Sequence, residues 1–293
     1  MIYQAIARLW VAIIRAGARW PQWLRAALAA VIGALGWLVV VRRRRIADAN
    51  LRACFPQMSQ GERRAIAQRM FRRVARGVLD YGVLWHGSAT QLQAYVRLEG
   101  AEHLEANMGR PLILLAPHFV GLDAGGIRLS MERQMATIYA RQSNAVWDEK
   151  LRAGRARFNE PVLIAKRGFD LRIALRAIRS GLPFYYLPDM DNGDVNSIFV
   201  PFFGIPAATV PMVSRLARSV GARVMMAVTE QTPKGYVVHL GAPWADFPGV
   251  SVEEDTARMN REIERWVLRM PDQYLWTHRR FKTRPPGAPA IYR

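Results

Sequence analysis

The sequence predicts an α/β domain with a mostly parallel central sheet covered by helices, preceded by membrane-associated N-terminal helices. Of the 293 residues, 51% are hydrophobic, which is enough to build a sizeable core. From residue 95 onward, short apolar runs alternate with amphipathic segments, a pattern typical of parallel sheets with both faces covered. The first 45 residues are apolar and rich in arginine. We therefore expect anchoring helices over residues 1–45 and one folded domain over residues 46–293.

The N-terminal region contains an uncharged stretch over residues 26–41, followed at once by Arg42–Arg45. A helix of this length reaches about 24 Å, less than the roughly 30 Å of a hydrocarbon core. Extending the helix back to Gln22 adds Arg25, whose side chain can snorkel to the interface. A single span would place Arg42–Arg45 in the cytoplasm by the positive-inside rule.

That span would also have to translocate three further arginines, Arg8, Arg15 and Arg19, which the same rule disfavours. We therefore expect two helices embedded from the cytoplasmic face, with basic side chains on the headgroups. The tryptophans expected near the interface are Trp10, Trp20, Trp23 and Trp37. A single span remains the open alternative.

Periodicity predicts the remaining elements. The stretch 46–86 is helical and broken at Pro56, and Ser59 with Glu62 forms a capping box for its second part. Strands are expected over 95–99, 112–116, 136–140, 162–165, 184–187, 223–229 and 236–240. Helices are expected over 123–132, 147–158, 171–180, 210–220 and 252–270, with Gly181 ending the third of these.

Charge and cysteine content restrict the possible functions. Lys and Arg number 42 and Asp and Glu 23, which gives a net charge of +19. Such a field attracts nucleic acid, anionic headgroups, phosphorylated substrates or acidic proteins. A single cysteine, Cys54, excludes an intramolecular disulfide and a Cys-cluster metal site.

The stretch HFVGLD carries the candidate chemistry. The strand 112–116 is followed by His118, and Asp123 opens the next helix. The intervening turn, eased by Gly121, can bring the imidazole and the carboxylate within hydrogen-bond reach. A carboxylate on one ring nitrogen raises the basicity of the other, which makes a general base. The spacing alone is common, so a structural histidine beside an N-capping aspartate is the alternative.

Two further strand ends carry polar residues. Arg141 and Asn144 lie in YARQSN after the strand 136–140, and Asp189 and Asp191 lie in LPDMDNG after the strand 184–187. Because parallel strands end at one edge of the sheet, we expect these side chains to line one crevice with His118. The apolar stretch 199–209 is expected to be an irregular loop that either walls an acyl chain or packs in the core.

The ordered motifs HFVGLD, YARQSN, LPDMDNG, FVPFFGIPAAT and QYLWTHRRFKTRP resemble the late acyltransferases of lipid A biosynthesis, of the lauroyl and myristoyl type. Mannoside acyltransferases belong to the same superfamily. The resemblance covers nearly the whole chain, including RRRRIADANLRACFPQMS, and implies a glycerolipid-acyltransferase-like fold. Family members often carry Glu where this chain has Asp123, which shifts the dyad geometry slightly.

The resemblance implies transfer of a fatty acyl group from an acyl-carrier-protein thioester to a hydroxyl of a phosphorylated lipid A precursor at the inner membrane. By analogy His118 is the general base and Asp123 orients it. Arg141 would hold an acceptor phosphate or neutralise developing charge. Asp189 and Asp191 would order the crevice by pairing with Arg141.

By the same analogy, Arg279 and Arg280 would make further anionic contacts. The resemblance implies no metal, nucleotide or covalent acyl-enzyme. The expected partners are the acyl carrier protein, the lipid A precursor and anionic membrane lipids.

Other functions require different features. An acyltransferase for another phospholipid or glycolipid acceptor would use the same dyad. A non-enzymatic lipid-binding scaffold would not need His118 and Asp123 together. A nucleic-acid binder would need aromatic residues interleaved with basic ones, or a known reading motif, and neither is present in the sequence. His278, in the THRRF tail, is a weaker candidate for the site than His118.

Overall fold

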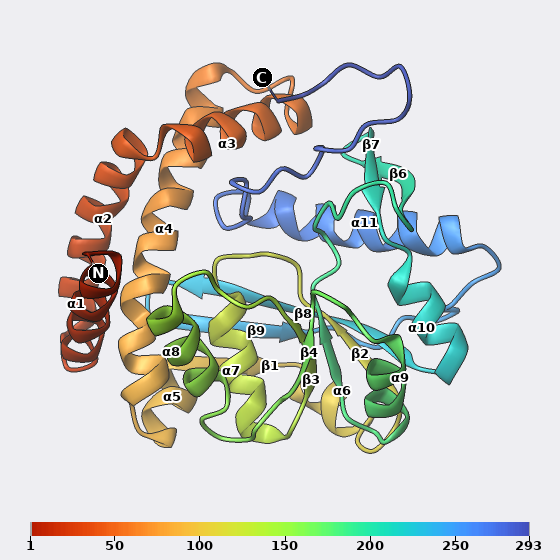
Figure 1. Cartoon of the computed structure of the whole chain (residues 1–293), viewed down its shortest axis with the longest axis horizontal. Helices are drawn as coiled ribbons and strands as arrows, with labels where there is room; N and C mark the ends of the chain where they lie inside the picture. Colours follow the sequence, from red (N-terminus) through yellow and green to blue (C-terminus); the bar gives the residue numbers. More distant parts are fainter. Residues whose placement is uncertain (1, 293) are drawn as a thin grey trace.

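The computed structural model describes residues 2–292, and Figure 1 shows the course of the chain. The helices are α1 (Ile2–Gly17), α2 (Gln22–Val39), α3 (Val41–Cys54), α4 (Gln60–His86), α5 (Ala89–Tyr95), α6 (Ala101–Glu105), α7 (Leu122–Glu132), α8 (Ala145–Arg155), α9 (Leu171–Arg179), α10 (Met212–Val220) and α11 (Val252–Arg269). The strands are β1 (Val96–Glu99), β2 (Leu112–Leu115), β3 (Ala136–Tyr139), β4 (Val162–Ala165), β5 (Phe184–Tyr186), β6 (Ile198–Phe202), β7 (Ile205–Thr209), β8 (Arg223–Thr232) and β9 (Gly235–Leu240).

The central sheet is mostly parallel, as expected. Its strand order is β1-β9-β8-β2-β5-β3-β4, and β8–β9 is its one antiparallel pair among the described strands. Strand β2 lies at the centre between β8 and β5, so the turn that follows it opens at the middle of the sheet edge. This is the position where open α/β sheets hold their ligands.

Both faces of the sheet are covered by helices (Figure 1). Side chains of β2 alternate between the faces: Ile113 and Leu115 join one buried cluster, while Leu112 and Leu114 join the other. The first cluster includes residues of α9, α10, α11 and the N-terminal half of α4. The second includes residues of α7, α8 and the C-terminal end of α4. This double burial explains why the strands are continuous apolar runs.

The N-terminal helices α1 and α2 pack along α4 (Figure 1). Their close approach depends on two glycines: a Cβ on Gly33 would lie 2.5 Å from the Cα of Arg72, and one on Gly82 would lie 2.3 Å from the carbonyl oxygen of Ile14. The boundary expected at residue 45 falls inside α3, so the chain crosses it as a continuous helix.

A buried ion pair attaches α2 to α4. Arg25 Nε lies 3.1 Å from Asp80 Oδ1, and both side chains are buried. Arg76 and the Tyr236 hydroxyl also bind Asp80. The expectation that Arg25 snorkels to an interface is therefore wrong, because this guanidinium faces the domain. Trp37, also expected at the interface, is buried against Phe71.

The outward face of α1 and α2 is apolar and exposed. Trp23 is 71% exposed and Val39 is 77% exposed. The other large apolar side chains exposed along this face are Ile6, Leu9, Val31, Leu35, Leu38 and Val40. Among residues 2–292, α2 alone is long and apolar enough to cross a membrane, a test that buried core helices and signal sequences also pass.

Most of the predicted elements are confirmed to within a few residues at their ends. The capping box of α4 forms, with Ser59 accepting from the Glu62 amide and the Glu62 carboxylate accepting from the Ser59 amide. The stretch 199–209, expected as an irregular apolar segment, is instead the antiparallel hairpin β6–β7, packed on α11. Buried Phe202 and Ala207 place this hairpin in the core, as the second interpretation held.

We predict that Arg25→Ala lowers the free energy of unfolding by roughly 3 kcal/mol, because it leaves the buried Asp80 carboxylate with fewer cationic partners. Urea unfolding of the detergent-solubilised chain measures this change. Arg19→Ala, which removes a neighbouring exposed arginine, is the matched control and should cost less than about 0.5 kcal/mol. Equal costs for the two variants would show that the pair with Asp80 is not a stabilising contact.

Candidate active site

The site forms where two neighbouring strands end in register. Strands β2 and β5 are parallel, and Leu115 pairs with Tyr186 at their carboxyl ends. His118 and Asp189 each lie three residues beyond this pair, so the chain brings them together at the same edge. The C-terminal segment also fixes the turn that contains His118, because the His118 carbonyl oxygen accepts a hydrogen bond from the Leu275 amide at 2.9 Å.

Asp189 binds His118 with both of its oxygens. Oδ1 lies 2.7 Å from the imidazole Nδ1, and Oδ2 accepts from the His118 backbone amide at 3.0 Å. Burial opposes ionisation of Asp189, but the attraction and hydrogen bonds of His118 outweigh it and hold the pKa of Asp189 well below its usual range. An ionised carboxylate is only an acceptor, so in the neutral imidazole Nδ1 carries the proton and Nε2 keeps its lone pair. The partly exposed imidazole is therefore arranged as a general base.

Asp123 is not the partner of His118, which corrects the expected dyad. Its Oδ1 accepts from Arg155 Nη2 at 2.6 Å and from Nε at 3.0 Å, and its Oδ2 accepts from the Tyr81 hydroxyl. The turn becomes helical at once, with the Gly125 amide bonded to the Gly121 carbonyl. Asp123 consequently lies on the first turn of α7, where its carboxylate meets α8 and α4.

A second imidazole lies beside His118. The ring centroids of His118 and His278 are 5.8 Å apart, and the Tyr274 hydroxyl lies 3.4 Å from His278 Nε2. Burial lowers the pKa of His278 to about 4, partly opposed by the nearby Asp189 carboxylate. His278 is thus neutral near pH 7. Its place in the site was missed because the sequence separation of 160 residues hides the pairing of the C-terminal segment with the His118 turn.

An apolar groove of about 590 Å³ opens at His118 and His278. Its walls come mainly from α2 and α4, and the remaining lining residues come from α1, the start of α3 and the loops after β2, β5 and α11. The apolar residues and glycines along it are Trp10, Ile32, Gly33, Gly36, Val40, Met70, Phe71, Val74, Ala75, Val78, Met190 and Leu275. The volume is in the range of small-molecule sites, and the lining suits a hydrocarbon chain.

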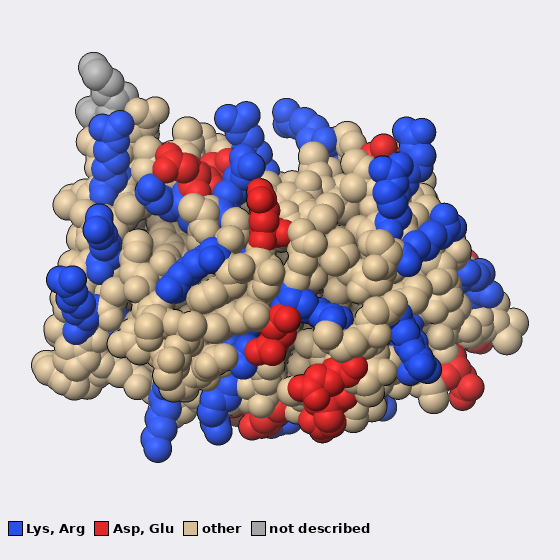
Figure 2. All heavy atoms as spheres, turned by 90° about the horizontal axis from the view of Figure 1, so that it is seen from below, with Lys and Arg blue, Asp and Glu red and all other residues tan. Residues whose placement is uncertain are grey.

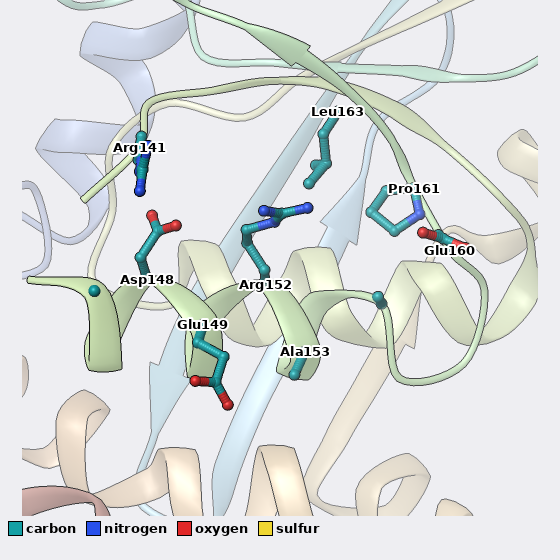
Figure 3. A pocket seen from close by; sticks show the side chains of 10 residues that line it. Arg141, Asp148, Glu149, Arg152, Ala153, Glu160, Pro161 and Leu163 are labelled. Carbon is teal, nitrogen blue, oxygen red and sulfur yellow. The ribbon is translucent and has the colours of Figure 1, made fainter. Parts of the chain in front are cut away.

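A basic pocket of about 450 Å³ lies at the carboxyl ends of β3 and β4. Arg141, Arg152, Lys166 and Arg167 line it together with Asp148. Figure 3 shows Arg141 and Asp148 pointing toward one another and Arg152 reaching toward β4 across an adjoining hollow of about 310 Å³.

The carboxylate of this pocket is already engaged, since Asp148 accepts from the Tyr139 hydroxyl and from the Gln142 amide. These hydrogen bonds lower the pKa of Asp148. The pocket therefore keeps a net positive charge that suits a phosphate group.

The other predicted residues are placed elsewhere. Neither Asp189 nor Asp191 pairs with Arg141: Asp191 accepts from the Thr283 amide at 2.7 Å and fixes its own loop. Arg280 is 1% exposed and donates to the Ala208 carbonyl and the Thr209 hydroxyl, so it supports the core and is not free for substrate.

The last two candidates stay outside the basic pocket. Arg279 lies over the ring of Tyr292 at 5.6 Å, and Asn144 caps α8 by accepting from the Trp147 amide. Among residues 2–292, no group of three or more His, Cys, Asp or Glu side chains is arranged to hold a metal ion.

The shifted pKa of His278 predicts a pH dependence of stability. An imidazole with a folded pKa of about 4 and an unfolded pKa of about 6.5 binds protons more readily in the unfolded chain. Stability should therefore fall as the pH drops from about 6.5 to about 4. We expect His278→Asn to lose less stability than wild type between pH 7 and pH 5, measured by urea unfolding. His103→Asn is the control, and it should retain the wild-type dependence.

Comparisons with known proteins agree with one another. The family model of bacterial lipid A biosynthesis acyltransferases matches residues 2–283. The lipid A biosynthesis lauroyltransferase of Escherichia coli (strain K12) is 32% identical over 295 residues, covering 97% of this chain and 95% of that protein. The palmitoleoyltransferase of the same strain is 30% identical, covering 97% and 95%, and the myristoyltransferase is 30% identical, covering 96% and 88%.

Among solved structures, a 1-acyl-sn-glycerophosphate acyltransferase from Thermotoga maritima is similar with a TM-score of 0.39 and 16% identity. The match covers 87% of this chain and 99% of the Thermotoga maritima chain, and at such a TM-score the likeness supports no functional argument. The family model, by contrast, spans nearly all of the residues, and the curated relatives match along almost their whole length. The chain therefore belongs to the bacterial lipid A biosynthesis acyltransferases.

Proposed function

We propose that the protein transfers a fatty acyl group from an acyl-carrier-protein thioester to a hydroxyl of a lipid A precursor, with His118 as the general base. His118 Nε2 takes the hydroxyl proton as the oxygen attacks the thioester carbonyl. When the tetrahedral intermediate collapses, the thiolate leaves and takes the same proton back from Nε2. Asp189 stays ionised throughout and stabilises the imidazolium. The observation that carries the proposal is the two-point contact between Asp189 and His118 at the mouth of an apolar groove.

The groove is the proposed place for the acyl chain. It is mostly apolar and meets solvent, and His118 forms part of its wall. A chain lying between α2 and α4 would present its carbonyl carbon near His118 Nε2, as a near-attack geometry requires. Asp123 has a separate role in this proposal. Its ion pair with Arg155 fixes α7 against α8 and thereby supports the turn that carries His118.

The basic pocket is the proposed place for an acceptor phosphate. Strand β3 is two strands from β2 and β4 is three, so the pocket lies roughly 10–15 Å along the sheet edge from His118. A phosphorylated sugar lipid can bridge such a distance between its phosphate and the reacting hydroxyl. Arg141 retains the role expected from the sequence, and Arg152, Lys166 and Arg167 add to the charge.

The exposed apolar face of α1 and α2 is the proposed contact with the cytoplasmic leaflet of the inner membrane. We favour interfacial binding over a single span, because α2 is held against α4 by the ion pair between Arg25 and Asp80 and by the close packing at Gly33. Spanning in this arrangement would draw the arginine-rich helix α4 into hydrocarbon at a large cost. Figure 2 shows basic side chains spread over one face of the molecule, with fewer acidic side chains among them. Together with the net charge of +19, this suits an acidic carrier protein as donor.

The catalytic pair predicts non-additive losses. His118→Ala and Asp189→Asn should each lower acyl transfer by about 10²-fold or more, and Asp189→Asn should add nothing in the His118→Ala background. Asp191→Asn, the same change two residues along, is the matched control and should stay within a few-fold of wild type. Rates are measured with purified acyl carrier protein donor. Near-normal turnover of Asp189→Asn would refute the assignment of this pair.

The basic pocket predicts selectivity for phosphate. We expect Arg141→Gln to raise the KM for the phosphorylated acceptor about 10-fold, the scale of one lost charge-assisted hydrogen bond, and to spare a dephosphorylated acceptor. Arg172→Gln, an exposed arginine on α9, controls for the loss of one positive charge. An equal loss on both acceptors would mean that Arg141 does not hold a phosphate.

A further inference from the structure

A second basic pocket is lined by residues from the end of α2, from α3 and from the first turns of α4. Its volume is about 300 Å³, and Arg44, Arg45, Arg63 and Arg64 line it beside the ring of Trp37. No step of acyl transfer uses this pocket, and its residues are distinct from those around Arg141.

Two of these guanidinium groups are fixed in place by the backbone. Arg44 Nη1 donates to the Trp37 carbonyl at 3.1 Å, and its guanidinium lies 5.4 Å above the ring of Trp37. Arg63 Nη1 donates to the carbonyls of Phe55 and Met58. Arg63 Nε is buried and has no hydrogen-bond partner within residues 2–292.

The positive charge of the pocket is not neutralised by the protein. Arg45 and Arg64 are exposed, and neither has an ion-pair partner in the described part of the chain. Asp48 also lines the pocket, but its carboxylate pairs with Arg52. The pocket thus contains four guanidinium groups and one carboxylate, and that carboxylate is already paired with Arg52.

The pocket lies next to the exposed apolar face of α2, and this position favours a lipid as its ligand. Leu38 and Val39, on the last turn of α2, belong to the exposed apolar face, and Trp37 of the same turn lines the pocket. If α2 lies in a membrane interface as proposed above, the pocket opens at the level of the headgroups. A soluble acidic protein would not need an apolar surface beside the charge.

We propose that this pocket binds the phosphate headgroup of an anionic membrane phospholipid, in preference to the zwitterionic headgroup of phosphatidylcholine, and so fixes the depth and orientation of α2 at the bilayer surface. The inference rests on the proposed membrane docking of α1 and α2. Arg45 and Arg64 supply the bidentate contacts, while Arg44 and Arg63 shape the pocket.

Vesicle co-sedimentation of the full chain tests this site without turnover. The vesicles are phosphatidylcholine with either phosphatidic acid or oleate, matched for surface potential. The wild-type chain should bind the phosphatidic acid vesicles about 10-fold more tightly, because the pocket recognises the phosphate. The surface potential alone would attract the chain equally to both kinds of vesicle. The double variant Arg45→Gln/Arg64→Gln should lose this preference while keeping its affinity for vesicles of phosphatidylcholine alone.

The matched control is Arg8→Gln/Arg42→Gln, which removes the same charge from exposed N-terminal positions that do not line the pocket. It should weaken binding to both anionic vesicles equally and keep the preference for phosphate. Equal binding of the wild-type chain to phosphatidic acid and oleate vesicles would overturn the site. Loss of the preference in both double variants would do the same. Failure to bind any vesicle would instead refute the membrane docking itself.

Discussion

The contact between Asp189 and His118 is the interaction on which the rest of the site depends. Its geometry follows from sheet pairing, because both residues lie three positions beyond a registered pair at the ends of β2 and β5. Burial alone would favour a neutral Asp189, and the imidazole and the His118 amide reverse that preference. One carboxylate therefore selects the tautomer of the neutral ring, orients the imidazole and leaves Nε2 free of this contact.

The N-terminal helices contribute to the groove beside His118 as well as to the exposed apolar face. They form one wall of the groove, and the buried pair between Arg25 and Asp80 holds them against α4. This packing exposes an apolar face on one side of α2 and encloses a lipid-sized groove on the other. Substrate arriving from a bilayer would meet the groove without leaving the interface. In the proposed function, membrane docking and binding of the acyl chain therefore both depend on this helix pair.

The sequence was sufficient for the fold class, for most elements and for the position of His118 directly after a strand, because these depend on local periodicity and on a motif next to a strand. It was insufficient for the partner of His118. Asp123 is near in sequence, but helix α7 begins before it and directs it to Arg155. Asp189 required knowledge that β5 is the neighbour of β2, which is a long-range pairing. Arg280 and Arg25 were misplaced for a related reason, since charge alone does not reveal a buried partner.

The most direct test of the central claim is ¹⁵N NMR of the imidazole of His118 in the detergent-solubilised chain at pH 8, assigned with His118→Gln. Pairing with an ionised Asp189 predicts a neutral ring protonated at Nδ1, with Nε2 showing the chemical shift of an unprotonated nitrogen. Asp189→Asn should abolish this tautomer preference, whereas Asp123→Asn should leave it unchanged. A His118 ring protonated at Nε2 in the wild-type chain would contradict the account.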